Sequence, residues 1–258
     1  MKWPTWLIMM RHDVSVYNVL RDKKSRDPLY QEFLRSFKKD WLSLETAILA
    51  KRVQEKFRLQ MGDHNTPLTD SKSAKAEEVG RELRSIGELP DVIFISPYDR
   101  TWATFEGLKR GWPELEKVKW LEEERIREMG HGLALLCNDK KVFEALNPKQ
   151  KLLREIEGPY WYKYPQGENI PRVRERNHSW LGTLIDNFAE KKVLAISHHV
   201  NILVTRANLE RWSASDFIGI NNNEKPINCG LTRYDGHPQL GSRGRFKLTY
   251  YNEAYYAK

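Results

Sequence analysis

The chain has 258 residues, a formal charge of +8, 40% hydrophobic residues and nine Trp. This apolar content suffices for a substantial core, so we expect a folded globular protein of one large or two small domains. The two cysteines, Cys137 and Cys229, exclude a disulfide framework and fit a reducing compartment.

The N-terminal stretch MKWPTWLIMM has a short apolar run that ends in charged residues, which is not typical of a signal peptide. No stretch approaches the length of a membrane span, so we expect a soluble, cytoplasmic protein without a membrane partner. The basic residues are interleaved with Glu and Asp, as in EKFRLQ and RVRERN. This pattern is typical of solvated helix faces and argues against a nucleic-acid partner.

Apolar runs rich in β-branched residues predict the strands of a sheet. In chain order they are TWLIMM (5–10), DVIFIS (91–96), KVLAIS (192–197), the weaker NCGLTRY (228–234) and the alternating edge strand RFKLTYY (245–251). Buried strands without alternation are typical of parallel sheets that are covered on both faces.

Helical patterns lie between these strands. Ala76, Val79, Leu83 and Ile86 fall three or four residues apart and predict one apolar helix face. The stretches RTWATFEGL and VRERNHSWLGTLIDNF behave similarly. Helices that alternate with buried strands predict an α/β fold, namely a three-layer α/β/α sandwich with a mostly parallel central sheet.

Two regions are longer than simple connections. Residues 19–66 predict a helical insertion of two helices, and residues 133–172 a loop-rich insertion that includes GPYWYKYPQGENIPR. We expect a single domain over residues 1–258, with these insertions over the active site. The aromatics of YWYKY fit either a core or a platform for a substrate ring, and the core is favoured.

Polar residues follow the predicted strands at their carboxyl ends, where ligands bind in open α/β sheets. Arg11 and His12 follow the first strand, Arg100 follows the second, and His198 follows the third. Glu128 lies between the second and third, just before a glycine-rich turn. The topology therefore predicts that two arginines, two histidines and a carboxylate converge on one edge.

The ordered combination of these motifs resembles the histidine phosphatase superfamily, also called the phosphoglycerate mutase-like family. The matching stretches span nearly the whole chain: RHDVSVYN, PLT (67–69), SPYDRTWATFEGL, RIREMGHG, GPYWYKYPQGEN and SHH. The resemblance implies that His12 is the nucleophile and forms a phosphohistidine. It also implies that Glu128 protonates the leaving oxygen.

The resemblance further implies a set of phosphate-binding residues around the nucleophile. These are Arg11, Asn18, Arg100 and His198, and His198 would also take part in catalysis. Two arginines offer forked donors for phosphoryl oxygens, and their charge should lower the pKa of His12. No metal site is predicted, because there is no HExxH motif and the His and Cys spacings do not fit zinc.

The sequence departs from the family pattern at two positions. Asp13 and His199 stand where the family usually has glycine. Both residue types tolerate a left-handed backbone better than most. We expect the Asp13 carboxylate to point away from the phosphate site or to pair with a base. The neighbouring carboxylates of residues 122–124 compete with Glu128 for the acid role, and we expect them to face solvent.

The predicted function is that of a metal-independent phosphomonoesterase without a cofactor, acting on a small phosphorylated metabolite. Met129-Gly130-His131 follows Glu128 where mutases of this family typically have Arg-His-Tyr-Gly, which favours transfer to water. The alternatives are a phosphoglycerate-type mutase and a non-catalytic module that binds phosphate ligands or proteins. The sequence leaves the substrate and the oligomeric state open.

Overall fold

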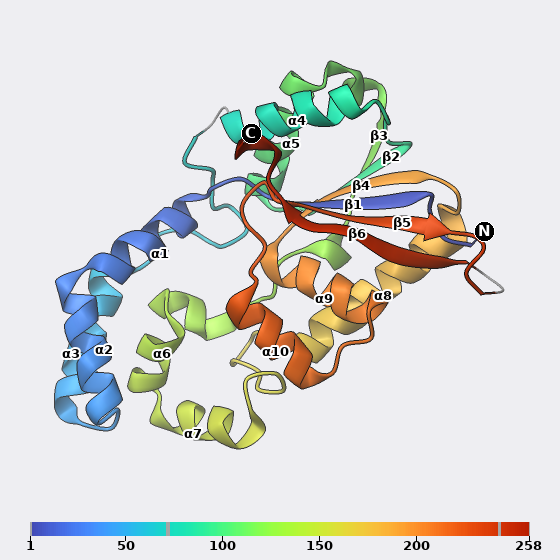
Figure 1. The fold of residues 1–258 in the computed structure, drawn as a ribbon. Coiled ribbons are helices and arrows are strands. Elements are labelled where there is room, and N and C mark those ends of the chain that lie inside the picture. The colour runs from blue at the N-terminus through green and yellow to red at the C-terminus, as the bar shows by residue number, and fades with distance from the viewer. Residues whose placement is uncertain (1, 71–72, 242–243, 258) are drawn as a thin grey trace. The chain divides into compact units, whose positions relative to one another are not determined.

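The computed structural model describes residues 2–70, 73–241 and 244–257. The chain divides into two compact units (Figure 1). The first consists of Met1–Ser15, Pro67–Glu128 and Arg172–Lys258, and the second of Val16–Thr66 and Met129–Pro171. The two predicted insertions fall largely within the second unit. The assignment of residues 1–258 to one domain with insertions over an active site stays a prediction.

The first unit contains a six-stranded sheet. Its strand order is β3 (Lys119–Glu122), β2 (Val92–Ile95), β4 (Lys192–Ser197), β1 (Trp6–Arg11), β5 (Leu231–His237) and β6 (Arg245–Glu253). The first four strands in this order pair in parallel, whereas β5 is antiparallel to β1 and β6 is antiparallel to β5. The predicted α/β fold with a mostly parallel sheet is therefore confirmed.

Two apolar cores cover the two faces of this sheet. Ile8 and Met10 of β1 pack into one core with α4 (Ala74–Ile86) and α5 (Asp99–Gly111). Leu7 and Met9 pack into the other core with α8 (Ile170–Asn187) and α9 (His199–Leu209). This alternation follows from the two-residue period of a strand, and it creates the three layers of the first unit (Figure 1).

The position of α5 depends on a close approach to α4. A Cβ atom on Gly111 of α5 would lie 2.0 Å from the Glu77 carbonyl oxygen, and one on Gly80 of α4 would lie 2.5 Å from the Leu108 carbonyl oxygen. Only glycine allows the two backbones to meet at these points. The helix predicted from Ala76 onwards is present as α4, but Ile86 is 51% exposed and does not belong to its buried face.

The remaining helical elements complete the chain. They are α1 (Val16–Arg26), α2 (Pro28–Lys39), α3 (Leu44–Phe57), η1 (Pro113–Lys117), η2 (Glu124–Ile126), η3 (Gly132–Cys137), α6 (Lys140–Leu146), α7 (Pro148–Glu157), α10 (Ala214–Asn223) and η4 (Tyr255–Ala257). Within the described ranges, no helix is long and apolar enough to cross a membrane.

The second unit has its own core, which includes Phe33, Val53 and Phe143. Residues 19–66 contain three helices, not the two predicted, because Asp27 is extended before Pro28 and caps α2 by accepting from the Leu29 amide. The region predicted to be loop-rich contains the helices α6 and α7. In the YWYKY stretch the three tyrosines are buried and the tryptophan is 57% exposed, in agreement with the favoured core interpretation.

Candidate active site

Three parallel strands end side by side in the first unit. Arg11, the last residue of β1, lies opposite Ser197, the last residue of β4, and Ile95 of β2 lies opposite Ile196. The His12 amide donates to the Ser197 carbonyl oxygen at 3.0 Å. The imidazole rings of His12 and His198 consequently lie 5.1 Å apart, centroid to centroid. The prediction that both histidines reach one edge of the sheet agrees with this geometry.

His12 is buried, and its tautomer follows from one contact. The Nδ1 atom lies 2.7 Å from the Asp13 carbonyl oxygen. Because a carbonyl oxygen can only accept, Nδ1 carries the proton and Nε2 keeps its lone pair. Burial, followed by the charges of Arg100 and Arg11, holds the pKa of His12 well below its usual range. The imidazole is therefore neutral near pH 7 and can act as a nucleophile through Nε2.

His198 is fully buried at the N-cap of α9. Its Nε2 atom is 2.7 Å from Ser96 Oγ, and its ring meets Tyr98 edge to face at 4.9 Å. Burial, followed by the charge of Arg100, lowers the pKa of His198. Its buried Nδ1 atom has no hydrogen-bond partner among the residues that the structure describes. A buried polar atom in this state fits a site completed by a ligand oxygen.

Arg11 and Arg100 supply the positive charge of the site, and both side chains are buried. Arg11 Nη1 donates to the Pro226 carbonyl oxygen at 2.7 Å. Arg100 lies in the first turn of α5, with its guanidinium carbon 4.6 Å from the centre of the Tyr98 ring. Both charges lower the pKa of both histidines, as expected for cations close to the two imidazoles.

Glu128 lies beside the helix that His198 begins. Its Oε1 atom accepts a hydrogen bond from the Val200 amide at 3.2 Å, two residues after His198. The backbone of Glu128 is held from α8, because Arg176 Nη2 donates to the Glu128 carbonyl oxygen at 3.0 Å. The structure thus brings this carboxylate to the same strand ends as the histidines.

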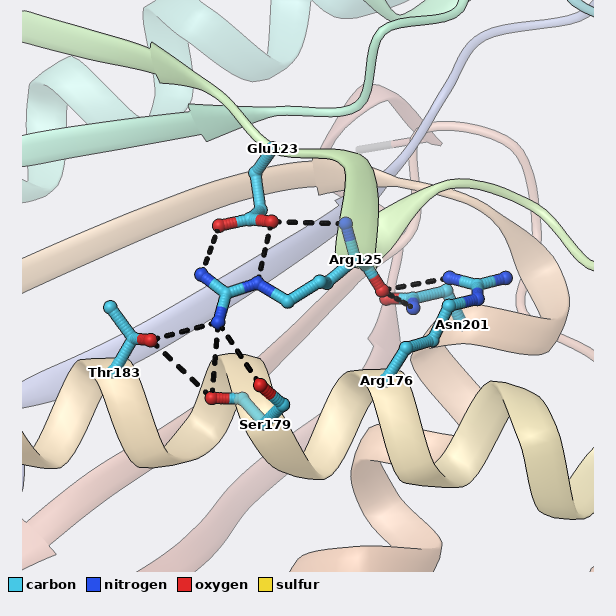
Figure 2. Close-up of polar contacts among 6 residues, drawn as sticks. All are labelled: Glu123, Arg125, Arg176, Ser179, Thr183 and Asn201. Atoms are coloured by element: carbon cyan, nitrogen blue, oxygen red, sulfur yellow. Dashed lines mark hydrogen bonds and ion pairs between the residues drawn. The ribbon is translucent and has the colours of Figure 1, made fainter.

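Figure 2 shows the polar network that holds the segment before Glu128. Arg176 Nη1 and Asn201 Nδ2 both donate to the Arg125 carbonyl oxygen, at 2.7 and 3.3 Å. The Arg125 guanidinium forms two hydrogen bonds with Glu123 and one with Thr183 at 2.9 Å. These contacts tie the segment to α8 and α9.

The three carboxylates that compete with Glu128 differ in exposure and in their partners. Glu122 is exposed and accepts from Trp102 Nε1 at 3.1 Å. Glu124 pairs with Arg127 and its side chain is 70% exposed. The prediction that all three face solvent is wrong for Glu123, whose side chain is only 11% exposed because Arg125 covers it.

The backbone is not left-handed at either of the two positions that depart from the family pattern. Neither Asp13 nor His199 has a positive φ, so neither position requires a left-handed conformation. The Asp13 carboxylate accepts hydrogen bonds from Ser73 Oγ at 2.8 Å and from the Val14 amide at 2.6 Å. These partners are a hydroxyl and an amide, not the base that we expected as one of two possibilities.

Several residues of the site were not predicted. Asn228 Nδ2 donates to the carbonyl oxygens of His12 at 2.8 Å and Asp13 at 3.2 Å. Arg176 and Asn228 carry no local sequence signal, since each acts through the backbone of a distant segment. Ser96 directly follows β2, so the strand-end argument that selected His198 could also have selected it. Asn18 belongs to α1 of the second unit, and its role in phosphate binding stays a prediction.

A sequence model of the histidine phosphatase superfamily (branch 1) matches residues 51–242. The match covers most of the chain, which therefore belongs to the histidine phosphatase superfamily. Arg11 and His12 lie outside the matched span. Phosphoglycerate mutase-like protein AT74H of Arabidopsis thaliana is 28% identical over 180 residues, which are 62% of this chain and 62% of the relative. Phosphoglycerate mutase-like protein AT74 of the same organism is 29% identical over 177 residues, which are 62% of this chain and 54% of that relative. The aligned region therefore spans less than two thirds of the length of either relative.

Solved structures share the fold. Bacillus stearothermophilus YhfR has a TM-score of 0.67 at 16% identity, over 98% of this chain and 99% of that chain. A mycobacterial glucosyl-3-phosphoglycerate phosphatase in complex with VO3 has a TM-score of 0.61 at 18% identity, over 96% of this chain and 99% of that chain. At these identities the similarity establishes the fold alone.

Proposed function

We propose that this protein is a metal-independent phosphomonoesterase that acts on a small phosphorylated metabolite through a phosphohistidine on His12. The observation that carries the proposal is the state of His12. It is buried and neutral, its Nδ1 proton is held by a carbonyl oxygen, and two buried arginines lie close enough to lower its pKa. A neutral imidazole beside fixed cations suits attack on a phosphate anion.

The proposed reaction has two steps, transfer of the phosphoryl group to His12 and then to water. In the first, the lone pair on His12 Nε2 forms a bond to phosphorus, the bond to the leaving oxygen breaks, and Glu128 gives that oxygen a proton. In the second, water attacks phosphorus, the nitrogen–phosphorus bond breaks, and the Glu128 carboxylate takes the proton from water. Arg11, Arg100 and His198 bind the phosphoryl oxygens in both steps. Phosphate leaves with His12 neutral again.

The comparisons support this proposal at the level of the family. The superfamily is named for histidine phosphatases, and one protein of the same fold is a glucosyl-3-phosphoglycerate phosphatase. The curated relatives are described as phosphoglycerate mutase-like, so a mutase is the second candidate. Hydrolysis is favoured because Met129-Gly130-His131 follows Glu128 in place of the basic motif typical of mutases.

A labelling experiment tests the nucleophile. A radiolabelled phosphomonoester is mixed with the enzyme, and the reaction is quenched within milliseconds in base. We expect a protein-bound label that is stable in base and lost in acid, as expected for a phosphoimidazole and not for a phosphoserine. The label should be absent from His12→Ala and present in His178→Ala, a matched change of an exposed histidine on α8.

The fate of the label separates the candidate functions. Release as inorganic phosphate supports the phosphatase, and transfer to an added sugar acid would support the mutase. A label that survives His12→Ala would show that another residue is the nucleophile. Binding of phosphate without any label or turnover would instead favour the non-catalytic module.

A further inference from the structure

Hydrogen bonds to the Asp13 side chain hold the loop that follows β1. Asp13 is buried, and both carboxylate oxygens accept hydrogen bonds, Oδ1 from the Val14 amide and Oδ2 from Ser73 Oγ. Cys229 lies against the same carboxylate. Burial, then the charge of Asp13 and a hydrogen bond to it, raises the pKa of the Cys229 thiol well above its usual range. The thiol is therefore protonated near pH 7.

The main chain of Asp13 makes hydrogen bonds with residues of the candidate active site. Its carbonyl oxygen accepts from His12 Nδ1 at 2.7 Å and from Asn228 Nδ2 at 3.2 Å. Its amide donates to Thr104 Oγ1 at 2.9 Å, and that hydroxyl donates to the Arg100 carbonyl oxygen at 2.6 Å. The two peptide groups on either side of the Asp13 Cα thus join the imidazole of the nucleophile to the helix turn that carries the phosphate-binding arginine.

The local conformation of Ser73 is unfavourable, although its hydroxyl contacts Asp13. Ser73 occupies the N-cap of α4 but makes no capping hydrogen bond, and its backbone is left-handed, with φ 47° and ψ 58°. The Asp70 carboxylate accepts from the Ala74 amide at 3.0 Å instead. A serine that is fully buried, strained and without its usual capping role points to a requirement for its hydroxyl elsewhere.

We propose that Asp13 is a positioning residue for the nucleophile: its side chain, anchored on Ser73, holds the peptide whose carbonyl oxygen keeps the proton on His12 Nδ1 and the lone pair on Nε2. The inference rests on the proposed function for the role of His12. A glycine, the residue typical of the family here, has no side chain to make these contacts. If the carbonyl oxygen shifts, the proton can move to Nε2, and the nucleophilic lone pair is lost.

The test compares three substitutions with the wild-type chain. Asp13→Ala removes both side-chain hydrogen bonds, and Ser73→Ala removes only one. Asp13→Asn can still accept from the Val14 amide and can donate to Ser73 Oγ. Asp216→Ala is the matched control, because it removes a different Asp–Ser hydrogen bond in the same unit, the 2.7 Å contact with Ser213 Oγ at the N-cap of α10.

Two measurements report on positioning. Nitrogen-15 NMR of the imidazoles identifies the tautomer of His12, and steady-state kinetics separates kcat from KM. We expect Asp13→Ala to populate the Nε2–H tautomer and to lower kcat by about ten- to a hundredfold, the range typical of residues that orient a catalytic group. KM should change less than kcat. Asp13→Asn should restore most of the activity, and Asp216→Ala should match wild type.

Two outcomes would overturn the proposal. One is an Asp13→Ala enzyme with the wild-type tautomer and wild-type kcat. The other is an Asp13→Asn enzyme as impaired as Asp13→Ala with His12 still protonated at Nδ1, which would assign the effect to charge. If Asp13→Ala does not fold, Ser73→Ala replaces it. A changed His12 tautomer with a lowered kcat supports the proposal, and the wild-type tautomer with wild-type kcat overturns it. A wild-type protein without phosphatase activity would refute the proposed function alone, because the NMR measurement needs no turnover.

Discussion

The buried Lys24 of the second unit and the buried His12 of the first have different surroundings. Lys24 Nζ donates to the Asp139 carboxylate at 2.8 Å and also to the Asn138 carbonyl oxygen. Tyr30 donates to the same carboxylate at 2.7 Å. In this cluster a cation, an anion and their donors satisfy one another inside the protein.

The histidine cluster of the first unit is organised differently. His12 and His198 are kept neutral by burial and by the positive charges of Arg11 and Arg100, and the buried Nδ1 of His198 has no partner in the described part of the chain. A cluster in which a cation and an anion compensate each other offers little to a charged ligand, whereas neutral imidazoles beside two arginines suit an anionic ligand. Four predictions test this difference.

The largest effect is expected for Glu128→Gln, which keeps the shape of the side chain and removes its transferable proton. Alkyl phosphates, whose leaving oxygen is strongly basic, should be hydrolysed about 10²–10⁴-fold more slowly. p-Nitrophenyl phosphate should lose much less activity, because nitrophenolate leaves without a proton. Measurement of kcat for both substrates checks this. Equal losses on both would indicate that Glu128 positions the phosphate, and a silent substitution would move the acid role to another carboxylate.

Lys24→Met should lower the free energy of unfolding. It leaves the Asp139 carboxylate without its cation, and breaking such a buried pair costs about 3 kcal/mol of unfolding free energy. Urea denaturation monitored by circular dichroism measures the change. Lys23→Met, an exposed neighbour on α1, is the control and should differ from wild type by less than about 0.5 kcal/mol. A loss of the same size in both variants would show that the buried pair is not the cause.

The pH dependence of stability should reveal the neutral histidines. The pKa of His12 is lowered by burial, Arg100 and Arg11, so below about pH 6.5 the unfolded chain takes up a proton that the folded chain does not. Folding is therefore weakened as pH falls. His12→Ala should reduce this acid loss by up to about 2 kcal/mol between pH 7 and 5. His178→Ala should not, and identical pH slopes in all three proteins would contradict a neutral His12.

The smallest effect is expected from a chelator. In the proposed mechanism Arg11, Arg100 and His198 supply the donors for phosphoryl oxygens, so hydrolysis of p-nitrophenyl phosphate should continue unchanged in excess EDTA. The rate is measured before and after prolonged dialysis against the chelator. Loss of activity with recovery on addition of a divalent ion would contradict the proposed mechanism.

The predicted strands were found because their signal is local. The runs at 5–10, 91–96 and 192–197 are apolar on both faces, and each corresponds to a central strand of the sheet. Strand β3 (KWLE) was missed because it is a short edge strand with mostly exposed side chains. Its assignment depends on parallel pairing with β2, which no feature of its own four residues encodes.

The same distinction between local and long-range signals applies to the candidate site. The fold class and the order of the strand-end residues, including Arg11, His12, Arg100 and His198, follow from local sequence, because the chain direction of a strand dictates which residues emerge at its carboxyl end. How these residues are held depends on long-range contacts. The hydrogen bond from Ser73 to Asp13 spans 60 positions, and that from Asn228 to the His12 carbonyl oxygen spans 216. Such contacts depend on the packing of whole helices and strands, which short sequence patterns do not record.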